Sequence, residues 1–234
     1  MACIDYNKTH DKKIFKLDVI KYMRFLGLKY INAGYDGTFI KWLLTNNPMP
    51  YNSWGNGSAM RVSPVAYVSS SLEEVLELSR ISAEVTHNHP EGIKGAQAIA
   101  SCVFLAKEGV NKTQIKKFVN DNFYNLNFTI SDIRESYNFD VSCQGSVPQA
   151  IVSFLESDSF EDAVRNAISI GGDSDTIAAM SGSIAQAYYG ILKKIQKIGM
   201  NYLDEQLKSI VIMFSNQIID KDVKSVLISK SVNK

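Results

Sequence analysis

The chain has 234 residues, of which 45% are hydrophobic and 21% charged, a balance that supports a compact core and excludes intrinsic disorder. Lys and Arg together number 25 against 24 Asp and Glu, so no broad positive field is available to hold nucleic acid as a general partner. No apolar run reaches the roughly 18 residues of a membrane-spanning helix, and the N-terminus lacks a signal-peptide pattern, so we expect a cytoplasmic protein with no membrane partner.

Helical periodicity dominates the chain, whereas alternating strand patterns are nearly absent. Apolar residues at the spacing of one helix face recur, in chain order, at 15–27, from Ser71 onward, and at 93–107, 113–122, 147–156, 160–169, 177–189 and 202–214. No repeat and no Pro/Ser-rich linker divides the chain. The pattern therefore predicts an all-α fold, a single compact multi-helix domain over residues 1–234, in which 215–234 could form an extra C-terminal helix or tail.

Two of these helices begin with capping signals. Ser71 stands three residues before Glu74, and Asp158 stands three residues before Glu161. In such a capping box the first side chain accepts a backbone N–H of the first turn, and the second side chain reaches back. We therefore expect Ser71 and Asp158 to cap the helices that follow them.

Three long stretches, 46–64, 86–92 and 127–145, lack helical periodicity, and 171–175 forms a shorter fourth. A compact domain rarely keeps a long structureless segment without a use for it, so we expect functional residues in these stretches. The three cysteines are odd in number and lack short paired spacing, which argues against a disulfide framework or a zinc site. Cys102 lies in an apolar run and is expected to be a core thiol.

The segment 171–176, called the acidic elbow below, reads GGDSDT and precedes a helix of unusually small residues. Its two glycines permit a tight turn, and two carboxylates and a hydroxyl then converge at the start of the helix. Oxygen ligands suit a hard cation such as Mg²⁺, which prefers near-octahedral oxygen coordination. The spacing alone favours a plainer function, in which Asp173 or Asp175 caps the helix and neutralises its positive end.

The loop 51–61 reads YNSWGNGSAMR and combines two glycines with polar groups and an aromatic ring. Its backbone N–H groups could cradle a phosphate, and Trp54 could lie against a ring or a ribose. No Gly-Lys-Ser/Thr follows, so the loop is not a P-loop. As an isolated pattern it is more often a turn-rich connector.

The segment 86–90, THNHP, holds two of the three histidines. Histidines at i and i+2 could form a metal pair, but the sequence offers no further soft or imidazole ligands to complete a zinc site. Two interpretations stay open for this segment: His87 contacts a ligand, or Pro90 shapes a helix-terminating turn.

Five motifs follow one another along the chain: AGYDGTF at 33–39, GNGSAMRVSP at 55–64, AEVTHNHPEG at 83–92, DVSCQGSVP at 140–148 and GGDSDT at 171–176. Together they resemble the ADP-ribosylglycohydrolase family, which includes the dinitrogenase reductase-activating glycohydrolases. The resemblance covers approximately residues 15–214 and is most specific in the Gly-Asn-Gly segment and the acidic elbow.

The resemblance implies an all-helical hydrolase with two Mg²⁺ ions that removes ADP-ribose from a modified protein side chain or from a small ADP-ribose derivative. By that analogy the metal ligands are Asp173, Asp175 and Thr176. The implied substrate-binding residues are Gly34, Tyr35 and Gly37 in one loop, Ser53, Trp54, Gly55, Asn56 and Gly57 along the diphosphate and adenosine side of the pocket, and His87 as a ligand-contacting histidine.

The chain departs from the family at its N-terminus. Family members carry an early glutamate near a Gly-Asp pair and a Thr-Asp-Asp-Thr run that supplies the other half of the metal shell, and nothing before Phe15 matches either. Residues 1–6 resemble the helix that follows that run, so we expect a chain truncated relative to the family. The catalytic acid or base is therefore unassigned, and the metal content could be two ions, one or none.

Three hypotheses remain: a Mg²⁺-dependent hydrolase, an ADP-ribose-binding remnant that lacks half of the metal site, and a helical scaffold without activity. The sequence leaves open which residue or molecule carries the ADP-ribose, and whether Mg²⁺ or Mn²⁺ is preferred.

Overall fold

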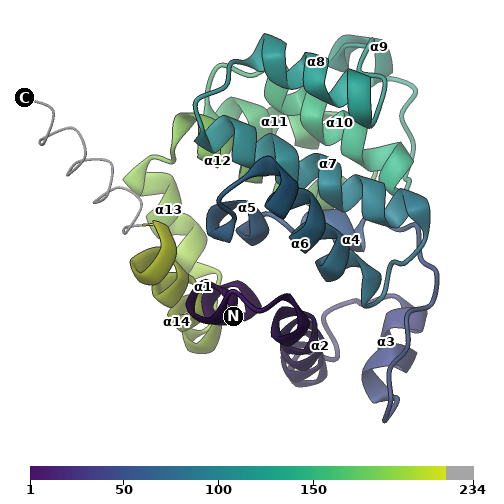
Figure 1. Cartoon of the computed structure of the whole chain (residues 1–234). Helices are drawn as coiled ribbons and strands as arrows, with labels where there is room; N and C mark the ends of the chain where they lie inside the picture. The colour runs from purple at the N-terminus through teal and green to yellow at the C-terminus, as the bar shows by residue number, and fades with distance from the viewer. Residues whose placement is uncertain (220–234) are drawn as a thin grey trace, which may run out of the picture.

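The computed structural model describes residues 1–219, and within that range the fold is built from helices without a β-sheet, as predicted. Figure 1 shows α7 crossing the upper part of the molecule, with α1, α2 and α14 in a lower tier. The elements are α1 (Ala2–Thr9), α2 (Lys12–Lys29), α3 (Gly37–Leu44), α4 (Gly57–Met60), α5 (Pro64–Val68), α6 (Leu72–Glu84), α7 (Pro90–Lys107), α8 (Lys112–Asn122), α9 (Ile130–Ile133), α10 (Cys143–Leu155), α11 (Phe160–Ser169), α12 (Ser174–Tyr189), α13 (Lys193–Asn201), α14 (Glu205–Phe214) and a π-helical turn η1 (Ser215–Ile219).

Capping side chains decide where the helices begin. Ser71 accepts the Glu74 backbone N–H at 3.2 Å, which confirms the first capping prediction. The second was wrong by one residue, because Ser159 is the N-cap of α11 and accepts the Asp162 N–H at 3.1 Å. Asp158 is already outside the helix, where its own N–H donates to the Asp162 carboxylate at 2.9 Å.

Apolar periodicity misplaced the starts of several other helices. α7, α10 and α12 begin three or four residues before the predicted 93, 147 and 177, because their first turns are polar and carry no apolar stripe. The helix predicted at 202–214 is α14, which begins three residues later than predicted because Asp204 caps it by accepting the Leu207 N–H at 2.8 Å. α13, whose C-cap is Tyr202, was not predicted. Short helices α4 and α9 also occupy two of the stretches predicted as non-helical.

The central helix is α7, which packs against α4, α6, α10 and α12. Gly95 allows the close approach of α10, because a Cβ at that position would collide with the Cys143 side chain. Cys102 is fully buried in this core, as predicted, and its thiol is free. The core thus holds α4 and the start of α10 around one end of α7.

The small residues of α12 let it pack tightly between α10 and α11. A Cβ at Gly182 would lie 3.4 Å from Val164, and the Ser181 hydroxyl donates to the Ala163 carbonyl at 3.4 Å. Because α12 also contacts α4, its N-terminus brings the acidic elbow to the same end of the core as the 51–61 loop.

The N-terminal helix α1 contacts α2, α5 and η1. Its Tyr6 hydroxyl donates to the Glu74 carboxylate at 2.6 Å and so attaches α1 to α6. Of the segment 215–234, residues 215–219 form η1, and residues 220–234 lie outside the described part of the chain. The prediction of a single domain over 1–234 stays a prediction. Between residues 1 and 219 no helix is both long and apolar enough to cross a membrane.

Candidate functional site

The 51–61 loop is held against the start of α10 by a short antiparallel bridge. Gly55 pairs with Ser142, and the Asn56 backbone N–H donates to the Val141 carbonyl at 2.7 Å. The two longest stretches without helical periodicity therefore meet here, although they lie far apart in the sequence.

Asn56 also joins the loop to the acidic elbow. Its side chain is 7% exposed, and Nδ2 donates to Asp173 Oδ2 at 2.6 Å and to Ser146 Oγ at 3.2 Å. Both amide hydrogens are thereby used, and a hydrogen bond to a carboxylate is stronger than one between neutral groups. The predicted loop residue Asn56 and the predicted metal ligand Asp173 thus belong to one cluster.

The acidic elbow turns through two glycines in the left-handed region. Gly171 has a φ of 75° and Gly172 a φ of 63°, values that favour glycine over other residues. Gly172 is also closely approached, because a Cβ there would lie 2.5 Å from the Tyr137 ring. The Tyr137 hydroxyl donates to the Gly145 carbonyl at 2.7 Å, so Tyr137 links the elbow to α10.

Asp173 occupies the N-cap position of α12, but its side chain makes no capping hydrogen bond. The aspartates at the N-caps of α2, α3 and α14 do accept backbone N–H groups. The capping interpretation that spacing favoured is therefore wrong for Asp173, whose carboxylate is directed to Asn56 instead. A carboxylate released from capping is available for a ligand.

The elbow offers oxygen donors that suit a hard cation. They are the carboxylates of Asp173 and Asp175 and the hydroxyl of Thr176, a residue that is 9% exposed. Over residues 1–219 no group of three or more His, Cys, Asp or Glu side chains could hold a metal ion. The donor set therefore fits a Mg²⁺-like cation only if water or substrate oxygens complete its shell.

His87 is held by a hydrogen-bonded chain that begins at the buried Arg61. An Arg61 Nη2 hydrogen is donated to Thr86 Oγ1 at 2.9 Å, and Thr86 Oγ1 lies 2.7 Å from His87 Nδ1. Because a guanidinium can only donate, Thr86 Oγ1 accepts from Arg61, and it still has its hydroxyl hydrogen and a second lone pair to offer Nδ1. Donation from Thr86 to Nδ1 would leave the hydrogen of neutral His87 on Nε2, as a donor on the other side of the ring.

Burial and the nearby charge of Arg61 keep His87 neutral. Burial, followed by the positive charge of Arg61, lowers the pKa of His87 to about 3. Burial also lowers the pKa of Arg61 to about 10, which still leaves it charged at neutral pH. Arg61 donates to neutral oxygens, including the Gly57 carbonyl at 2.8 Å, so its charge contributes a positive potential beneath the loop.

Glycines bring the loop backbone close to His87. A Cβ at Gly57 would lie 3.2 Å from His87 Nε2, and one at Gly55 would lie 3.6 Å from it. A Cβ at Gly92 would lie 2.6 Å from the Ser53 carbonyl oxygen. Nε2 of His87 thus lies beside the Gly-Asn-Gly backbone, in which the Gly55 N–H is donated to Ser53 Oγ at 3.1 Å and the Asn56 N–H to the Val141 carbonyl.

Two predicted segments lie around this cluster. Trp54 is 53% exposed and contacts His89 edge-on, with ring centroids 5.7 Å apart. Gly34 and Tyr35 lie in the turn between α2 and α3, and Gly37 is the first residue of α3. Asp36 in that turn interacts electrostatically with both Tyr51 and His87, which places the turn on the side of the 51–61 loop.

A cavity of about 340 Å³ lies next to the elbow and is lined by Tyr137, Phe139, Asp140, Gly145, Gln149 and three neighbours. Sequence reasoning missed Tyr137 and Ser146 as members of the site, and it gave no role to Arg61 or Thr86. Arg61, Thr86 and Ser146 do lie within the motifs at 55–64, 83–92 and 140–148, whereas Tyr137 lies outside all five motifs.

Comparison with known proteins matches residues 21–211 to the family model described as ADP-ribosylglycohydrolase. ADP-ribosylhydrolase ARH3 of Homo sapiens is 28% identical over 186 residues, which cover 59% of this chain and 51% of that protein. ADP-ribosylarginine hydrolase Tri1 of Pseudomonas putida (strain GB-1) is 27% identical over 144 residues, covering 58% of this chain and 39% of that protein.

The fold is similar to the solved structure titled "ADP-ribosylglycohydrolase-related protein complex", with a TM-score of 0.63 and 20% identity over 92% of this chain and 77% of that chain. In sequence, the chain spans about half the length of the ARH3 proteins it matches, 51% for the human protein.

Proposed function

Because the chain belongs to the ADP-ribosylglycohydrolase family, we propose that it hydrolyses the glycosidic bond that joins ADP-ribose to a protein side chain or to a small molecule, with Mg²⁺ as cofactor. The observation that carries the proposal is the 2.6 Å hydrogen bond from Asn56 to Asp173. It supports one site in which a phosphate-binding loop and a metal-binding elbow act on the same ligand.

The diphosphate of ADP-ribose is assigned to the loop 51–61. The backbone N–H of Gly57 and a hydrogen on His87 Nε2 would supply its donors, whereas the Gly55 N–H is already donated to Ser53 Oγ at 3.1 Å. The buried guanidinium of Arg61 adds a positive potential that favours an anion over a neutral ligand. Ser53 and Trp54 would line the remainder of this side.

The ribose is assigned to the elbow, where Asp173, Asp175 and Thr176 would hold the divalent cation. A bound cation supplies Lewis-acid assistance and a fixed orientation for the ribose hydroxyls and the attacking water. Asn56 keeps the Asp173 carboxylate in place during turnover. The leaving group would then face the cavity beside Tyr137 and Asp140, because that cavity adjoins the elbow.

A second candidate function is binding of ADP-ribose without hydrolysis. It is favoured by the small donor set, since two carboxylates and a hydroxyl leave a six-coordinate cation short of protein ligands. No general acid or base is assigned to the chain, which also favours binding without hydrolysis. Both candidate functions use the loop 51–61 to bind ADP-ribose.

The test is release of free ADP-ribose from peptides that carry it on arginine or on serine, with Mg²⁺, with Mn²⁺ and with a chelator. We expect metal-dependent release that Asp173→Asn abolishes. Asp121→Asn is the matched control, because Asp121 is exposed and its ion pair with Lys117 spans a solvated helix surface. Release that is equal in chelator, or unchanged in Asp173→Asn, would contradict the proposal.

Calorimetry with ADP-ribose separates the two candidates. Binding that His87→Ala weakens, without release from either peptide, would favour the binding function. The absence of both binding and release would end both proposals.

A further inference from the structure

The outward face of α2 carries large apolar side chains that remain exposed to solvent. Ile14 is 42% exposed, Leu17 66%, Phe25 49% and Leu28 43%. At 3.6 residues per turn, these side chains fall within an arc of about 80° and along about 21 Å of the helix; they are called the α2 stripe below. Figure 1 shows α2 at the lower edge of the molecule. Exposed apolar side chains that gather on one face mark an interaction site, whereas single ones are ordinary.

The opposite face of α2 attaches the helix to the rest of the fold. Phe15, Val19 and Gly27 are buried, and α2 contacts α1, α3 and α6. A Cβ at Gly27 would lie 2.7 Å from the Leu43 side chain, so α3 crosses α2 closely. Since buried positions occur toward both ends of α2, the stripe is presented on a helix that the fold holds in place.

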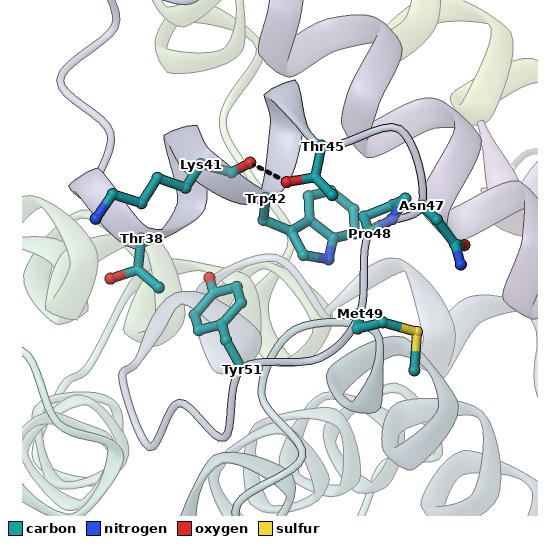
Figure 2. Close-up of a pocket in the computed structure, with 8 residues that line it drawn as sticks. All are labelled: Thr38, Lys41, Trp42, Thr45, Asn47, Pro48, Met49 and Tyr51. Atoms are coloured by element: carbon teal, nitrogen blue, oxygen red, sulfur yellow. Dashed lines mark hydrogen bonds between the residues drawn. The ribbon is translucent and has the colours of Figure 1, made fainter.

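A second cavity lies near α2 but is separate from the stripe. Its volume is about 320 Å³, and it lies between α3 and the segment 45–51 (Figure 2). α3 lines it with Thr38, Lys41 and Trp42, which share one side of that helix, whereas Leu43 lies on the other side. Because Leu43 is the side chain that approaches α2, the cavity does not belong to the surface that carries the stripe.

Lysines lie within and around the α2 stripe. Lys21 falls inside its arc, and Lys13 and Lys29 fall about 40° beyond its two edges; all three are exposed. The one acidic residue of α2, Asp18, pairs with Lys21 at 3.7 Å, and its side chain is only 14% exposed. Lys29 donates to the neutral side chain of Gln206. The face is therefore apolar and basic, so a partner that carries carboxylates would be complementary to it.

Charge and width decide which partner fits this face. A second copy of the chain, bound through the same stripe in an antiparallel pair, would bring Lys21 against Lys21, and like charges in contact oppose association. A helix that lies on a membrane buries a broad apolar face, whereas the stripe is narrow and has a cation at its centre. Apolar side chains in a narrow stripe are typical of a seam between two helices.

We propose that the α2 stripe is a docking surface for an amphipathic helix of another protein, whose apolar side chains are bordered by Asp or Glu. The stripe would pack against those apolar side chains, and a carboxylate of the partner would pair with Lys21 at the centre. The inference does not depend on the proposed hydrolase activity, because α2 contributes no residue to the 51–61 loop or to the acidic elbow.

The test is fluorescence anisotropy with two synthetic amphipathic helices that share a leucine stripe, bordered by glutamates in one probe and by lysines in the other. We expect the full chain to bind the glutamate probe and not the lysine probe. Binding should weaken as the salt concentration rises, because exposed charges are screened. Equal affinity for the two probes, or no binding of the glutamate probe, would overturn the inference.

Leu17→Ser and Phe25→Ser test the apolar contact. Each should weaken binding of the glutamate probe at least about tenfold, because an apolar side chain that becomes buried on binding is lost. Both side chains are exposed in the free protein, so the unfolding temperature should stay that of the wild type. Ile168→Ser is the matched control, since Ile168 is 55% exposed on α11, and it should leave the affinity unchanged. Wild-type affinity in both stripe variants would contradict the proposal.

Lys21→Glu tests the charge at the centre of the stripe. It should invert the preference, so that the lysine probe binds more tightly than the glutamate probe, a result that loss of folding would not produce. Lys194→Glu changes an exposed lysine of α13 and should keep the wild-type preference. An unchanged preference in Lys21→Glu would overturn the inference.

Two further measurements test the other partners. Vesicles of phosphatidylcholine and phosphatidylserine should not sediment with the chain, and the sedimentation coefficient of the chain alone should be the same in the wild type and in Leu17→Ser. Vesicle binding that Leu17→Ser removes would assign the stripe to a membrane instead. Dimerisation that Leu17→Ser removes would assign it to a second copy of the chain.

Discussion

The Asn56 side chain donates to the Asp173 carboxylate at 2.6 Å across 117 positions of sequence. This contact replaces the helix cap that Asp173 would otherwise form, and it ties the 51–61 loop to the start of α12. The position of the elbow therefore depends on the loop, and we expect changes at either residue to affect both metal and nucleotide binding.

Replacing Asn56 by Ala should lower the free energy of unfolding by about 1–3 kcal/mol, because Asp173 and Ser146 both lose a partner in a largely buried place. Turnover should fall at least about tenfold if one such bond positions the metal ligand. Urea unfolding and the peptide assay measure the two effects. Asn125→Ala is the control, since Asn125 is exposed and bonds only within its own turn in the described contacts; equal losses in both variants would contradict the role of Asn56.

Gly172→Ala should destabilise the protein more than Gly171→Ala. Both glycines have positive φ, so each substitution adds backbone strain of about 1 kcal/mol. Only Gly172 also faces the Tyr137 ring at 2.5 Å, whereas a Cβ at Gly171 meets nothing within 4 Å. Overpacking should add about 1–3 kcal/mol in the Gly172 variant. Thermal unfolding measures the difference. A lower unfolding temperature for Gly171→Ala than for Gly172→Ala would contradict this prediction.

His87 should make stability depend on pH in the acid range. Its pKa is lowered from 6.5 to about 3 by burial and by the charge of Arg61, so the unfolded state binds a proton that the folded state excludes. The contribution of neutral His87 to the free energy of unfolding is therefore complete above pH 6.5 and is lost as the pH falls toward 3. Urea unfolding from pH 7 to pH 4 should show a smaller decline for His87→Gln than for the wild type. His10→Gln, at an exposed position, should follow the wild type; an identical decline in all three proteins would exclude this role.

Thr86 should determine which His87 nitrogen carries the hydrogen. In the wild type the ¹⁵N shifts of the His87 ring should be those of the Nε2–H tautomer. Thr86→Val removes the hydroxyl between Arg61 and Nδ1, so we expect a mixture of tautomers and ADP-ribose affinity about tenfold weaker. Thr86→Ser keeps the hydroxyl and should restore both. A pure Nε2–H signal in Thr86→Val would contradict the relay.

Much of the helical fold could be predicted from the chain, because an apolar stripe at helical spacing is a local signal. Phe160–Ser169 was predicted with its observed bounds. Helix starts were predicted less well, since the first turns of α7, α10 and α12 are polar. α14 begins three residues after the predicted 202, because Asp204 caps it, and α13 was not predicted.

The site was predictable as motifs but not as geometry. Asp173, Asn56 and His87 could be named from their segments, yet their relationships arise only when distant segments pack together. Local spacing suggested that Asp173 caps α12, and the long-range contact with Asn56 overrides that preference. Tyr137 carries no local signal, because its importance comes from its close approach to Gly172, which lies in a distant segment of the sequence.

The central claim is that the elbow holds a divalent cation beside the loop that binds ADP-ribose. Its most direct test uses paramagnetic Mn²⁺ in place of Mg²⁺, added to the full chain with ADP-ribose, while the side-chain amide signals of Asn56 are recorded. We predict that these signals broaden strongly in the wild type and stay sharp in Asp173→Asn. Sharp Asn56 signals in the wild type, with broadening centred on residues away from the elbow, would contradict the account.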